Sequence, residues 1–476
     1  MLNQVIHGDC LEVLRTMPDN SVDAVVTDPP YGLSREPDIE EVLRHWLAGD
    51  DYNHRGGGFM GKEWDSFVPG PSVWREVYRV LKPGGHALVF AGTRTQDLMT
   101  VSLRMAGFEI RDVIEWLYFS GFPKSMDVGK QFDKRGGVIA NFEEFRDACL
   151  EALKKPGKTR SELQRRLGNY MLSHYLTRGS QPAVPVYRDY VVIRDYLELG
   201  DRFDAYFKEE AEREKIGKGN AGLAKGESRR NRSHIVGYKE TYYITAPATD
   251  LAKKWDGWGT ALKPAHEPII VARKPLIGTV AENVERFGTG AINIGGCRIG
   301  DEEVRSSGEV SNAWREAEGR TDRQAPNPSV NKGRFPANCV TTEPDAFFSK
   351  YFNITPPELS KKASKRDRNS DWRGEPINLE EKTTDDGRKK PIDNPFLRGK
   401  TKRINSHPTV KPTDLMAWLV RLITPPGGIV LDPFAGSGST CVAARREGFF
   451  FIGIEQELEY VEIARKRVGA INVVPS

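Results

Sequence analysis

Short apolar runs alternate with amphipathic stretches, and they gather towards the two ends of the chain. Seven runs predict β-strands, at 4–7, 24–27, 86–91, 113–119, 267–273, 429–431 and 449–454. Four amphipathic stretches predict helices, at 72–81, 95–105, 439–447 and 457–468. Strands that alternate with helices are typical of a largely parallel sheet with helices on both faces. We therefore expect one α/β sheet that is built from both ends of the sequence.

A long, mostly charged insertion separates these two blocks. Residues 159–169 predict a capped short helix that ends in a Gly-Asn turn, and 170–176 predict a second amphipathic helix. This is the outline of a helix-turn-helix, although an ordinary pair of helices fits the pattern equally well. We expect a catalytic half at 1–124, a helical insertion at 125–260 and a returning strand at 261–275. An irregular basic region at 276–404 and a cofactor-binding half at 405–476 complete this division.

Composition restricts the class of protein. The 476 residues carry a net charge of only +4, so a uniformly cationic surface is excluded, although local basic clusters at 229–232, 361–368 and 388–390 are candidates for phosphate contact. The five cysteines are scattered without a CxxC pair, which supports neither a disulfide framework nor a zinc site. No apolar stretch is long enough to span a bilayer, and the N-terminus has no signal-like segment, so we expect a cytoplasmic location.

A glycine-rich loop follows one of the C-terminal strands. Phe434-Ala435-Gly436-Ser437-Gly438 lies between a predicted strand and a predicted helix, where backbone N–H groups can approach a ligand closely. Glu455 ends the next strand and is placed to accept hydrogen bonds from ribose hydroxyls. Cys441 stands where a dinucleotide fingerprint needs its third glycine, and no Gly-Lys-Ser/Thr of a P-loop follows. The loop therefore favours a nucleotide-like ligand without a pyrophosphate.

The tetrapeptide Asp28-Pro29-Pro30-Tyr31 closes the apolar run 22–27 near the N-terminus. Alone it reads as a stiff turn as easily as a functional motif. Ligand sites of open parallel sheets form where neighbouring strand ends diverge, so its place at a strand end, with a glycine loop on another strand, favours the functional interpretation.

Together these segments resemble the N6-adenine/N4-cytosine DNA methyltransferases, in which Asp-Pro-Pro-Tyr is the catalytic motif and Phe-x-Gly-x-Gly binds S-adenosylmethionine. Having the catalytic motif first resembles the β-class. The resemblance covers about 1–125, 260–275 and the stretch from Ser406, including His407-Pro408-Thr409-Val410-Lys411-Pro412. Segments 59–65 and 121–125 look similar to phage and prophage members.

The resemblance implies a fold and a set of site residues. The fold is a seven-stranded, Rossmann-like S-adenosylmethionine-dependent methyltransferase sheet, circularly permuted, with an inserted helical or irregular target-recognition region. In that arrangement the last helix should lie beside the first strand. No metal is required. The implied catalytic residues are Asp28, Pro29, Pro30 and Tyr31. The implied cofactor-binding residues are Asp9, Lys411, Asp432, Phe434, Gly436, Gly438 and Glu455.

The expected chemistry is methyl transfer to the exocyclic amine of a base extruded from double-stranded DNA. Asp28 and the carbonyl of Pro29 would accept the two N–H hydrogens, and Tyr31 would stack on the base, a contact worth about 1–3 kcal/mol. Extrusion costs a few kcal/mol. A homodimer and a cognate restriction enzyme stay open questions at this point. Three segments are candidates for reading DNA, namely 55–59, the helical insertion and 361–403.

Several alternatives stay open. Asp before the prolines favours adenine N6 within the family, and N4-cytosine is the alternative. A C5-cytosine enzyme would need a Pro-Cys pair, which is absent. RNA or protein-amide methylation usually goes with Asn in place of Asp28. A non-catalytic phage DNA-binding factor is a further alternative, although the intact motif residues argue against it.

Overall fold

The computed structural model forms two compact units, each considered by itself. The first comprises Met1–Gly121, Ala265–Leu379 and Lys402–Ser476, and the second comprises Phe122–Pro264 and Glu380–Thr401. The structure describes residues 1–32, 37–54, 65–118, 125–134, 139–177, 183–205, 207, 215–220, 241–247, 250–306, 329–341, 405, 407 and 409–471.

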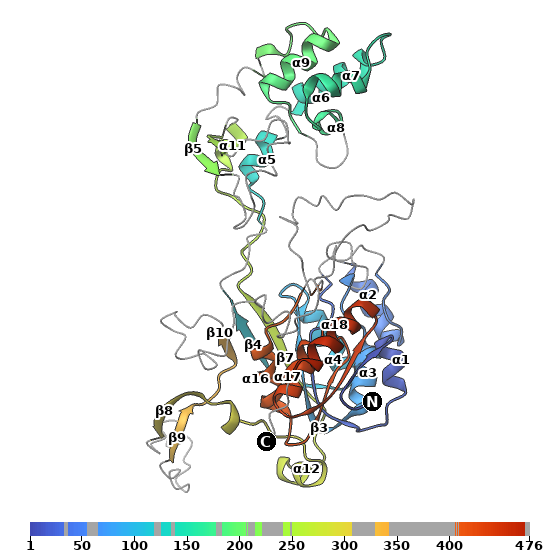
Figure 1. The fold of residues 1–476 in the computed structure, drawn as a ribbon, viewed down its shortest axis with the longest axis vertical. Coiled ribbons are helices and arrows are strands. Elements are labelled where there is room, and N and C mark those ends of the chain that lie inside the picture. The colour runs from blue at the N-terminus through green and yellow to red at the C-terminus, as the bar shows by residue number, and fades with distance from the viewer. Residues whose placement is uncertain are drawn as a thin grey trace. The chain divides into compact units, whose positions relative to one another are not determined.

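An eight-stranded sheet forms the centre of the first unit, with strand order β1-β12-β11-β2-β3-β7-β4-β10 (Figure 1). Neighbouring strands are parallel except at β7, which runs antiparallel to both β3 and β4. The strands are β1 (Gln4–His7), β2 (Val22–Thr27), β3 (Leu81–Phe90), β4 (Glu109–Leu117), β7 (His266–Arg273), β10 (Cys339–Thr341), β11 (Ile429–Asp432) and β12 (Phe450–Glu455). All seven strands expected from the sequence are present, and the short β10 is an eighth.

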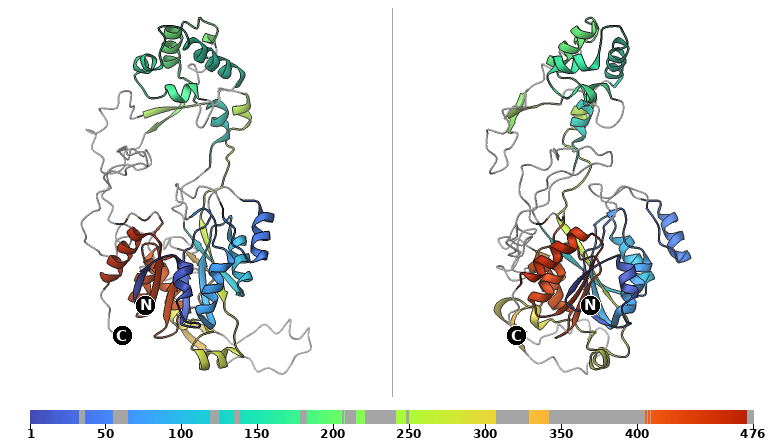
Figure 2. Two further views of the ribbon diagram at one scale, coloured as in Figure 1. Left: turned by 90° about the vertical axis from the view of Figure 1, so that its right-hand side faces the viewer. Right: turned by 45° about the vertical axis from the view of Figure 1, so that its right-hand side comes forward.

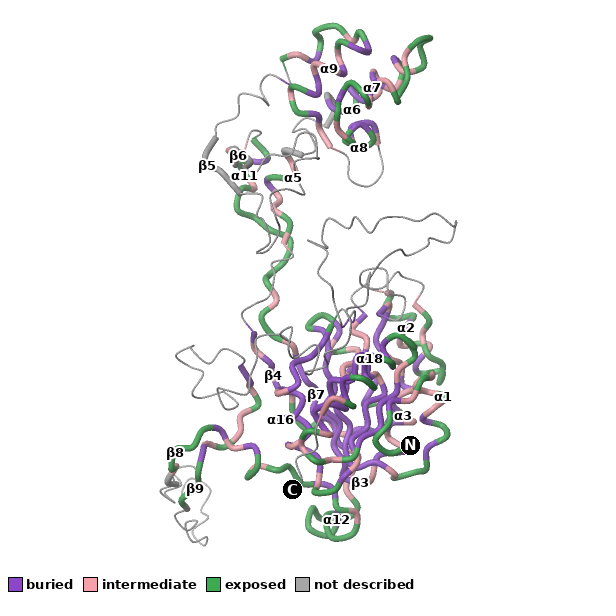
Figure 3. Tube along the Cα trace, in the orientation of Figure 1, coloured by how far each residue is buried: buried purple, intermediate pink, exposed green. Residues whose placement is uncertain are grey.

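Helices cover both faces of this sheet (Figure 2). The described helices of this unit are α1 (Cys10–Arg15), α2 (Ile39–Ala48), α3 (Pro71–Val80), α4 (Gln96–Met105), α12 (Val280–Phe287), α16 (Thr413–Ile423), α17 (Ser439–Arg446) and α18 (Leu458–Gly469), and α12 lies beyond the end of the strands. Side chains alternate along β2, so Val26 packs in the core beneath α16 and α17, whereas Val25 packs in the core beneath α1 and α3. The buried residues concentrate in these two layers (Figure 3).

The two ends of the chain meet in the sheet. β1 pairs in parallel with β12, with His7 opposite Glu455. The last helix, α18, packs on β1, and the Arg465 side chain donates from Nε and Nη2 to the Val5 carbonyl at 3.0 and 2.8 Å. The predicted contact between the last helix and the first strand is confirmed. Strands from the C-terminal stretch therefore sit between β1 and β2.

The stretch expected to be irregular, 276–404, contains ordered elements where it is described. α12 begins with a capping box between Thr279 and Glu282, which helps to explain a helix that buries little beyond Asn283. A 3-10 turn, η4 (Gly295–Cys297), and a hairpin of β8 (Ile299–Ser306) and β9 (Ser329–Arg334) follow. The basic segment 361–403 lies outside the described residues.

The second unit has its own aromatic core, which includes Phe145, Tyr190 and Phe207. Its elements are α5 (Val128–Lys134), α6 (Ile139–Ala152), α7 (Arg160–Leu167), α8 (Leu172–Leu176), α9 (Tyr187–Leu197), β5 (Lys215–Asn220), β6 (Thr241–Thr245) and α11 (Asp250–Lys254). The predicted helix, turn and second helix are present as α7, a left-handed Gly168 and the five-residue α8. In the described residues of both units, no helix combines the length and apolar character needed to cross a membrane.

Candidate active site

The two sequence motifs lie at the same edge of the sheet. β2 and β11 are neighbouring parallel strands, so their carboxyl ends meet there, with Asp28 after one and the glycine loop after the other. The Thr27 hydroxyl donates to Asp432 Oδ1 at 2.6 Å and joins the two strand ends directly. The structure thus brings together the halves that the chain separates by about four hundred residues.

A buried lysine holds the catalytic motif. Lys411 Nζ donates to Asp28 Oδ2 at 2.7 Å and to the Tyr31 hydroxyl at 3.0 Å, and lies 3.2 Å from Glu267 Oε2. The Tyr31 hydroxyl in turn donates to Glu267 Oε2 at 3.1 Å. The ammonium also lies 4.8 Å from the centre of the Phe90 ring. The structure places Lys411 against the motif at 28–31, and its expected contact with the cofactor stays a prediction.

The charges of this cluster shift one another's protonation. Burial raises the pKa of Asp28 and Glu267 adds to the rise, while Lys411 opposes it. Burial acts to lower the pKa of Lys411, but the two carboxylates outweigh it and leave that pKa raised. Burial and Glu267 raise the pKa of Tyr118 to about 12, and burial with Asp28 and Glu267 raises the pKa of Tyr31 further. Both phenols are therefore neutral near neutral pH.

One carboxylate oxygen of Asp28 makes no hydrogen bond to the described residues. Oδ1 is buried and has no hydrogen-bond partner among the described residues, whereas Oδ2 is bound to Lys411. A buried carboxylate oxygen without a donor is costly, and such an atom calls for an explanation. It is an acceptor ready for a ligand N–H.

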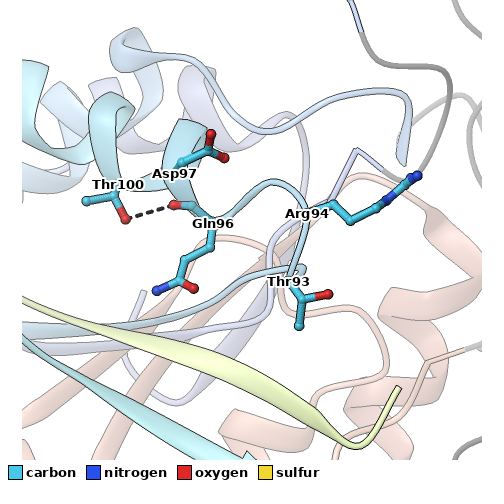
Figure 4. A pocket seen from close by; sticks show the side chains of 5 residues that line it. All are labelled: Thr93, Arg94, Gln96, Asp97 and Thr100. Carbon is cyan, nitrogen blue, oxygen red and sulfur yellow. Dashed lines mark hydrogen bonds between the residues drawn. The ribbon is translucent and has the colours of Figure 1, made fainter. Parts of the chain in front are cut away.

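The backbone of the motif is also fixed. The amide of Tyr31 donates to Asp65 Oδ1 at 2.8 Å, and the carbonyl of Tyr31 accepts from the Thr95 hydroxyl at 2.6 Å. Thr95 stands between β3 and α4, beside a polar hollow of about 580 Å³ (Figure 4). That hollow is lined by Thr93, Arg94, Gln96, Asp97 and Thr100. The Tyr31 backbone is therefore held on both sides.

The glycine loop requires glycine for conformational and steric reasons. Gly436 and Gly438 both have positive φ, at 52° and 82°. A Cβ on Gly438 would come 2.8 Å from the Cβ of Ala464, and one on Gly436 would come 2.8 Å from His407 Nε2. Phe434 packs at this loop, with its ring centre 6.3 Å from that of Trp74. The backbone is thus tightly enclosed on the protein side.

Carboxylates hold the two strand ends that flank the loop. Glu455 Oε2 accepts from the amide of Gly436 at 2.8 Å, and Oε1 accepts from the amide of Glu457 at 2.8 Å. Each oxygen keeps a second lone pair for a ligand hydroxyl. Asp432 Oδ1 accepts from the amide of Phe434 at 3.1 Å, and burial raises the pKa of Asp432 to about 6.

Comparison with known proteins decides the family. The family model described as DNA methylase, covering N6 and N4 methyltransferases, matches residues 22–168 and 224–466, more than half of the chain. This chain belongs to that family. Its members are described as DNA methylases.

Individual relatives match only in part. The type II methyltransferase M2.DpnII of Streptococcus pneumoniae is 52% identical over 66 residues, which is 14% of this chain and 25% of that protein. YubD of Escherichia coli (strain K12) is 49% identical over 65 residues, 14% of this chain and 29% of that protein. The chain thus spans about a quarter of the length of the curated relatives that it matches.

Solved structures of methyltransferases resemble the chain at low similarity. M1.HpyAVI in complex with SAM is 14% identical with a TM-score of 0.33, covering 98% of both chains. The cytosine-N4-specific PvuII DNA methyltransferase is 13% identical with a TM-score of 0.38, covering 97% of this chain and 85% of that one. At such TM-scores the two carry no further argument.

The remaining predicted site residue, Asp9, follows β1 at the edge where Glu455 ends β12. Its Oδ1 caps α1 by accepting from the amides of Leu11 and Glu12 at 2.9 and 3.1 Å, and the residue is exposed. Asp9 therefore lies at the sheet edge where β11 and β12 end, and it caps the N-terminus of α1.

Three residues of the site were not among the site residues predicted from the sequence. Glu267 is the second residue of β7, and a lone Glu at the start of an apolar run is typical of an exposed strand end. His407 lies in the segment before α16 and stacks edge-on against Tyr460, with ring centres 4.5 Å apart. Arg467 is fully buried in α18, and its Nη1 donates to the Ser437 carbonyl at 2.6 Å. An arginine on the apolar face of an amphipathic helix was the available clue for Arg467.

Proposed function

We propose that this chain transfers a methyl group from S-adenosylmethionine to the exocyclic amino group of a base extruded from double-stranded DNA, adenine at N6 in the first place. The observation that carries the proposal is the unpartnered Asp28 Oδ1, which lies one strand away from the glycine loop. The chain belongs to a family of DNA methyltransferases. To this family membership the proposal adds the target base, the residues that form the site and double-stranded DNA as the substrate.

The glycine loop and its neighbours form the proposed cofactor site. Gly436 and Gly438 leave the backbone free to approach the ligand, and Glu455 keeps lone pairs for the ribose hydroxyls. Asp9 reaches the same edge from β1 and is proposed to contact the adenine of the cofactor. When bound, S-adenosylmethionine supplies a methyl group on a sulfonium, whose sulfur keeps the bonding pair as the methyl moves to nitrogen.

The end of β2 forms the proposed amine site. Asp28 Oδ1 and the Pro29 carbonyl accept the two N–H hydrogens, which favours a pyramidal nitrogen whose lone pair faces the methyl group. Proline lacks an N–H, so no backbone donor of the motif competes for these oxygens. After transfer, the surplus proton on nitrogen passes to Asp28 Oδ1 and from there to solvent. Holding the nitrogen in line supplies most of the rate enhancement.

Adenine is proposed over cytosine because Asp28 stands first in the tetrapeptide. N4-cytosine is the alternative, since both bases offer an exocyclic amine of the same geometry to Asp28 and Pro29. A cytoplasmic location belongs to the same proposal, because it is where this DNA would be met. The homodimer and the cognate restriction enzyme stay predictions.

The helical insertion is proposed to read the target DNA. The α7–turn–α8 segment has the outline of a helix-turn-helix, with Leu163 and Leu172 in its core. The exposed basic side chains of α7 are Arg160, Arg165 and Arg166. Such side chains suit phosphate contact, while Ser173 on α8 is exposed for contact with a base edge.

The decisive experiment is to incubate the purified protein with labelled S-adenosylmethionine and unmodified double-stranded DNA, digest the product and identify the nucleoside. N6-methyl-2′-deoxyadenosine is the expected product. N4-methyl-2′-deoxycytidine would select the alternative base. DNA binding with no methylated nucleoside would overturn the proposed activity and favour a non-catalytic DNA-binding protein.

A further inference from the structure

The Lys411 ammonium has an acceptor for each of its hydrogens. An ammonium carries three donors, and three oxygens surround this one, from Asp28, Tyr31 and Glu267 at 2.7, 3.0 and 3.2 Å. The side chain is buried, and α16, which begins two residues later, is buried along nearly its whole length. The position of Lys411 is thus fixed at its ammonium group by three oxygens and at its backbone by the buried helix that follows.

The three acceptors come from distant parts of the sheet. β7 is antiparallel to β3, so the first residues of β7 lie at the edge where β2 and β3 end. That topology carries Glu267 to the catalytic motif, where it accepts from the Tyr31 hydroxyl. The hydrogen bonds therefore run in one direction, from Lys411 to Tyr31 and from Tyr31 to Glu267.

The charges in this cluster do not cancel. Asp28 and Glu267 carry two negative charges against the single positive charge of Lys411, which leaves −1 when all three are ionised. The other titratable groups that face them are Tyr31, Tyr118 and Asp432, and both phenols are neutral. A net charge of −1 in a poorly solvated site favours the positive charge that develops on an amine nitrogen as it is methylated.

We propose that Lys411 and Glu267 are positioning residues for the methyl transfer. Lys411 binds Asp28 Oδ2, so that Oδ1 faces the target amine, Glu267 binds Lys411 and the Tyr31 hydroxyl, and together the two residues set the site's net charge at −1. This inference rests on the proposed function. Neither residue touches the substrate. Lys411 keeps the Asp28 carboxylate ionised and oriented, and Glu267 restores the negative charge that Lys411 removes.

Three variants test this assignment, namely Lys411→Met, Glu267→Gln and the double variant. Lys411→Met leaves two buried carboxylates side by side, so one takes up a proton and Asp28 ionises only at higher pH. Its kcat at neutral pH should fall by about 100-fold, as misplaced catalytic groups do, and the acid limb of its pH–rate profile should move to higher pH. In the double variant Asp28 is again the single charge, so this limb should return towards the wild-type position.

Glu267→Gln alone keeps an amide oxygen for the Tyr31 hydroxyl but removes a like charge from Asp28. The acid limb should then move to lower pH, while kcat falls because the site is neutral. Affinity for S-adenosylmethionine, measured by calorimetry, should equal that of the wild type in all three variants. A merely structural role would not move the acid limb of the pH–rate profile in opposite directions in the two single variants. It would also not produce rescue by a second substitution.

Stability supplies a readout that needs no activity. A carboxyl group whose pKa is raised in the folded state stabilises the fold at low pH and loses that contribution as pH rises through the raised value. The melting temperature of Lys411→Met should therefore fall more steeply than that of the wild type as pH rises above the ordinary carboxyl range, and the double variant should recover the wild-type slope.

Matched controls lie at the opposite edge of the sheet. Lys274 donates to Asn20 Oδ1, Tyr78 O and Leu81 O at 2.8, 2.9 and 2.7 Å, just beyond the far end of β7. Glu109 accepts from Arg273 at 2.6 Å there. Lys274→Met and Glu109→Gln should change stability without moving the pH–rate profile.

Two results would overturn the inference while the proposed function stands. One is a Lys411→Met enzyme with the wild-type pH profile, and the other is a double variant no better than Lys411→Met. If the wild type itself transfers no methyl group, the proposed function fails. In that case the pH dependence of the melting temperature still tests the charge coupling among Lys411, Glu267 and Asp28. A Lys411→Met variant with the wild-type pH dependence would refute this coupling.

Discussion

The two loops of the proposed active site are built in opposite ways. The glycine loop takes its partners from nearby in the chain, because Gly436 binds Glu455 nineteen residues on and Ser437 binds Arg467 thirty residues on. The catalytic motif takes its partners from far away, since Lys411 lies 383 residues from Asp28 and Glu267 lies 236 residues from Tyr31. The contacts of the glycine loop are therefore local in sequence, whereas those of the motif at 28–31 form only in the folded sheet.

This difference separates what each loop contributes. The glycine loop belongs to the strand–loop–helix packing of β11, α17, β12 and α18, so damage to it should lower stability and cofactor affinity together. The catalytic motif is held by a charged cluster that strands far apart bring together, so damage to it should lower the rate and leave cofactor binding intact. Four substitutions test this division, beyond those given for Lys411 and Glu267.

Asp28→Asn should have the largest effect. The amide keeps the shape of the side chain but loses its charge and its ion pair with Lys411, so kcat should fall by about 100-fold or more, as when one preorganised group is removed from an active site. Affinity for S-adenosylmethionine should not change. Asp23→Asn is the control, a buried carboxylate of the same region that binds Lys82 and the amide of Ile429. It should lower stability and leave kcat unchanged, and a fully active Asp28→Asn enzyme would remove the catalytic assignment.

Asp432→Asn should change how stability depends on pH. Burial raises the pKa of Asp432 from 3.8 to about 6, so the folded state holds a proton that the unfolded chain has already released. The wild type should therefore lose stability relative to the variant as pH rises from about 4 to about 6, by roughly 3 kcal/mol at 1.36 kcal/mol per unit. Denaturant unfolding of both proteins across this range gives the difference. Parallel curves would mean that Asp432 titrates normally.

Arg467→Met should destabilise the glycine loop. The guanidinium donates to the carbonyl and hydroxyl of Ser437, at 2.6 and 3.0 Å, and to the Ser439 hydroxyl at 3.3 Å. Leaving such buried groups unpaired costs about 2 kcal/mol of unfolding free energy, and cofactor affinity should weaken with it. Lys466→Met, on the exposed face of α18, is the matched control and should be neutral. Equal stability of the two variants would contradict the role given to Arg467.

Gly438→Ala should destabilise through two causes, and Gly448→Ala, which should have the smallest effect of all, separates them. Both glycines have a φ near 80°, but a Cβ on Gly438 meets Ala464 at 2.8 Å whereas one on Gly448 meets nothing within 4 Å. Gly448→Ala therefore reports the conformational cost of about 1 kcal/mol. Gly438→Ala should add about 1–2 kcal/mol for the overlap and should weaken S-adenosylmethionine binding. Calorimetry and thermal unfolding of the pair measure both quantities.

Most of the sheet could be predicted from the sequence because strand and helix periodicity is a local property. The runs at 4–7 and 267–273 appear as β1 and β7 within a residue, and the meeting of the chain ends is confirmed by the pairing of β1 with β12. β10 was missed because three residues are too few to show an alternating pattern.

The sequence by itself determined the two loops. Asp28-Pro29-Pro30-Tyr31 and the glycines at 436 and 438 are recognisable because each depends on the backbone of a few consecutive residues. Only the tertiary structure decided that Lys411 and Glu267 converge on Asp28. That contact depends on an antiparallel β7 and on a buried α16, which bring a lone lysine and a lone glutamate to one strand end. Isolated charged residues carry no local pattern, so their meeting is a property of the packed sheet.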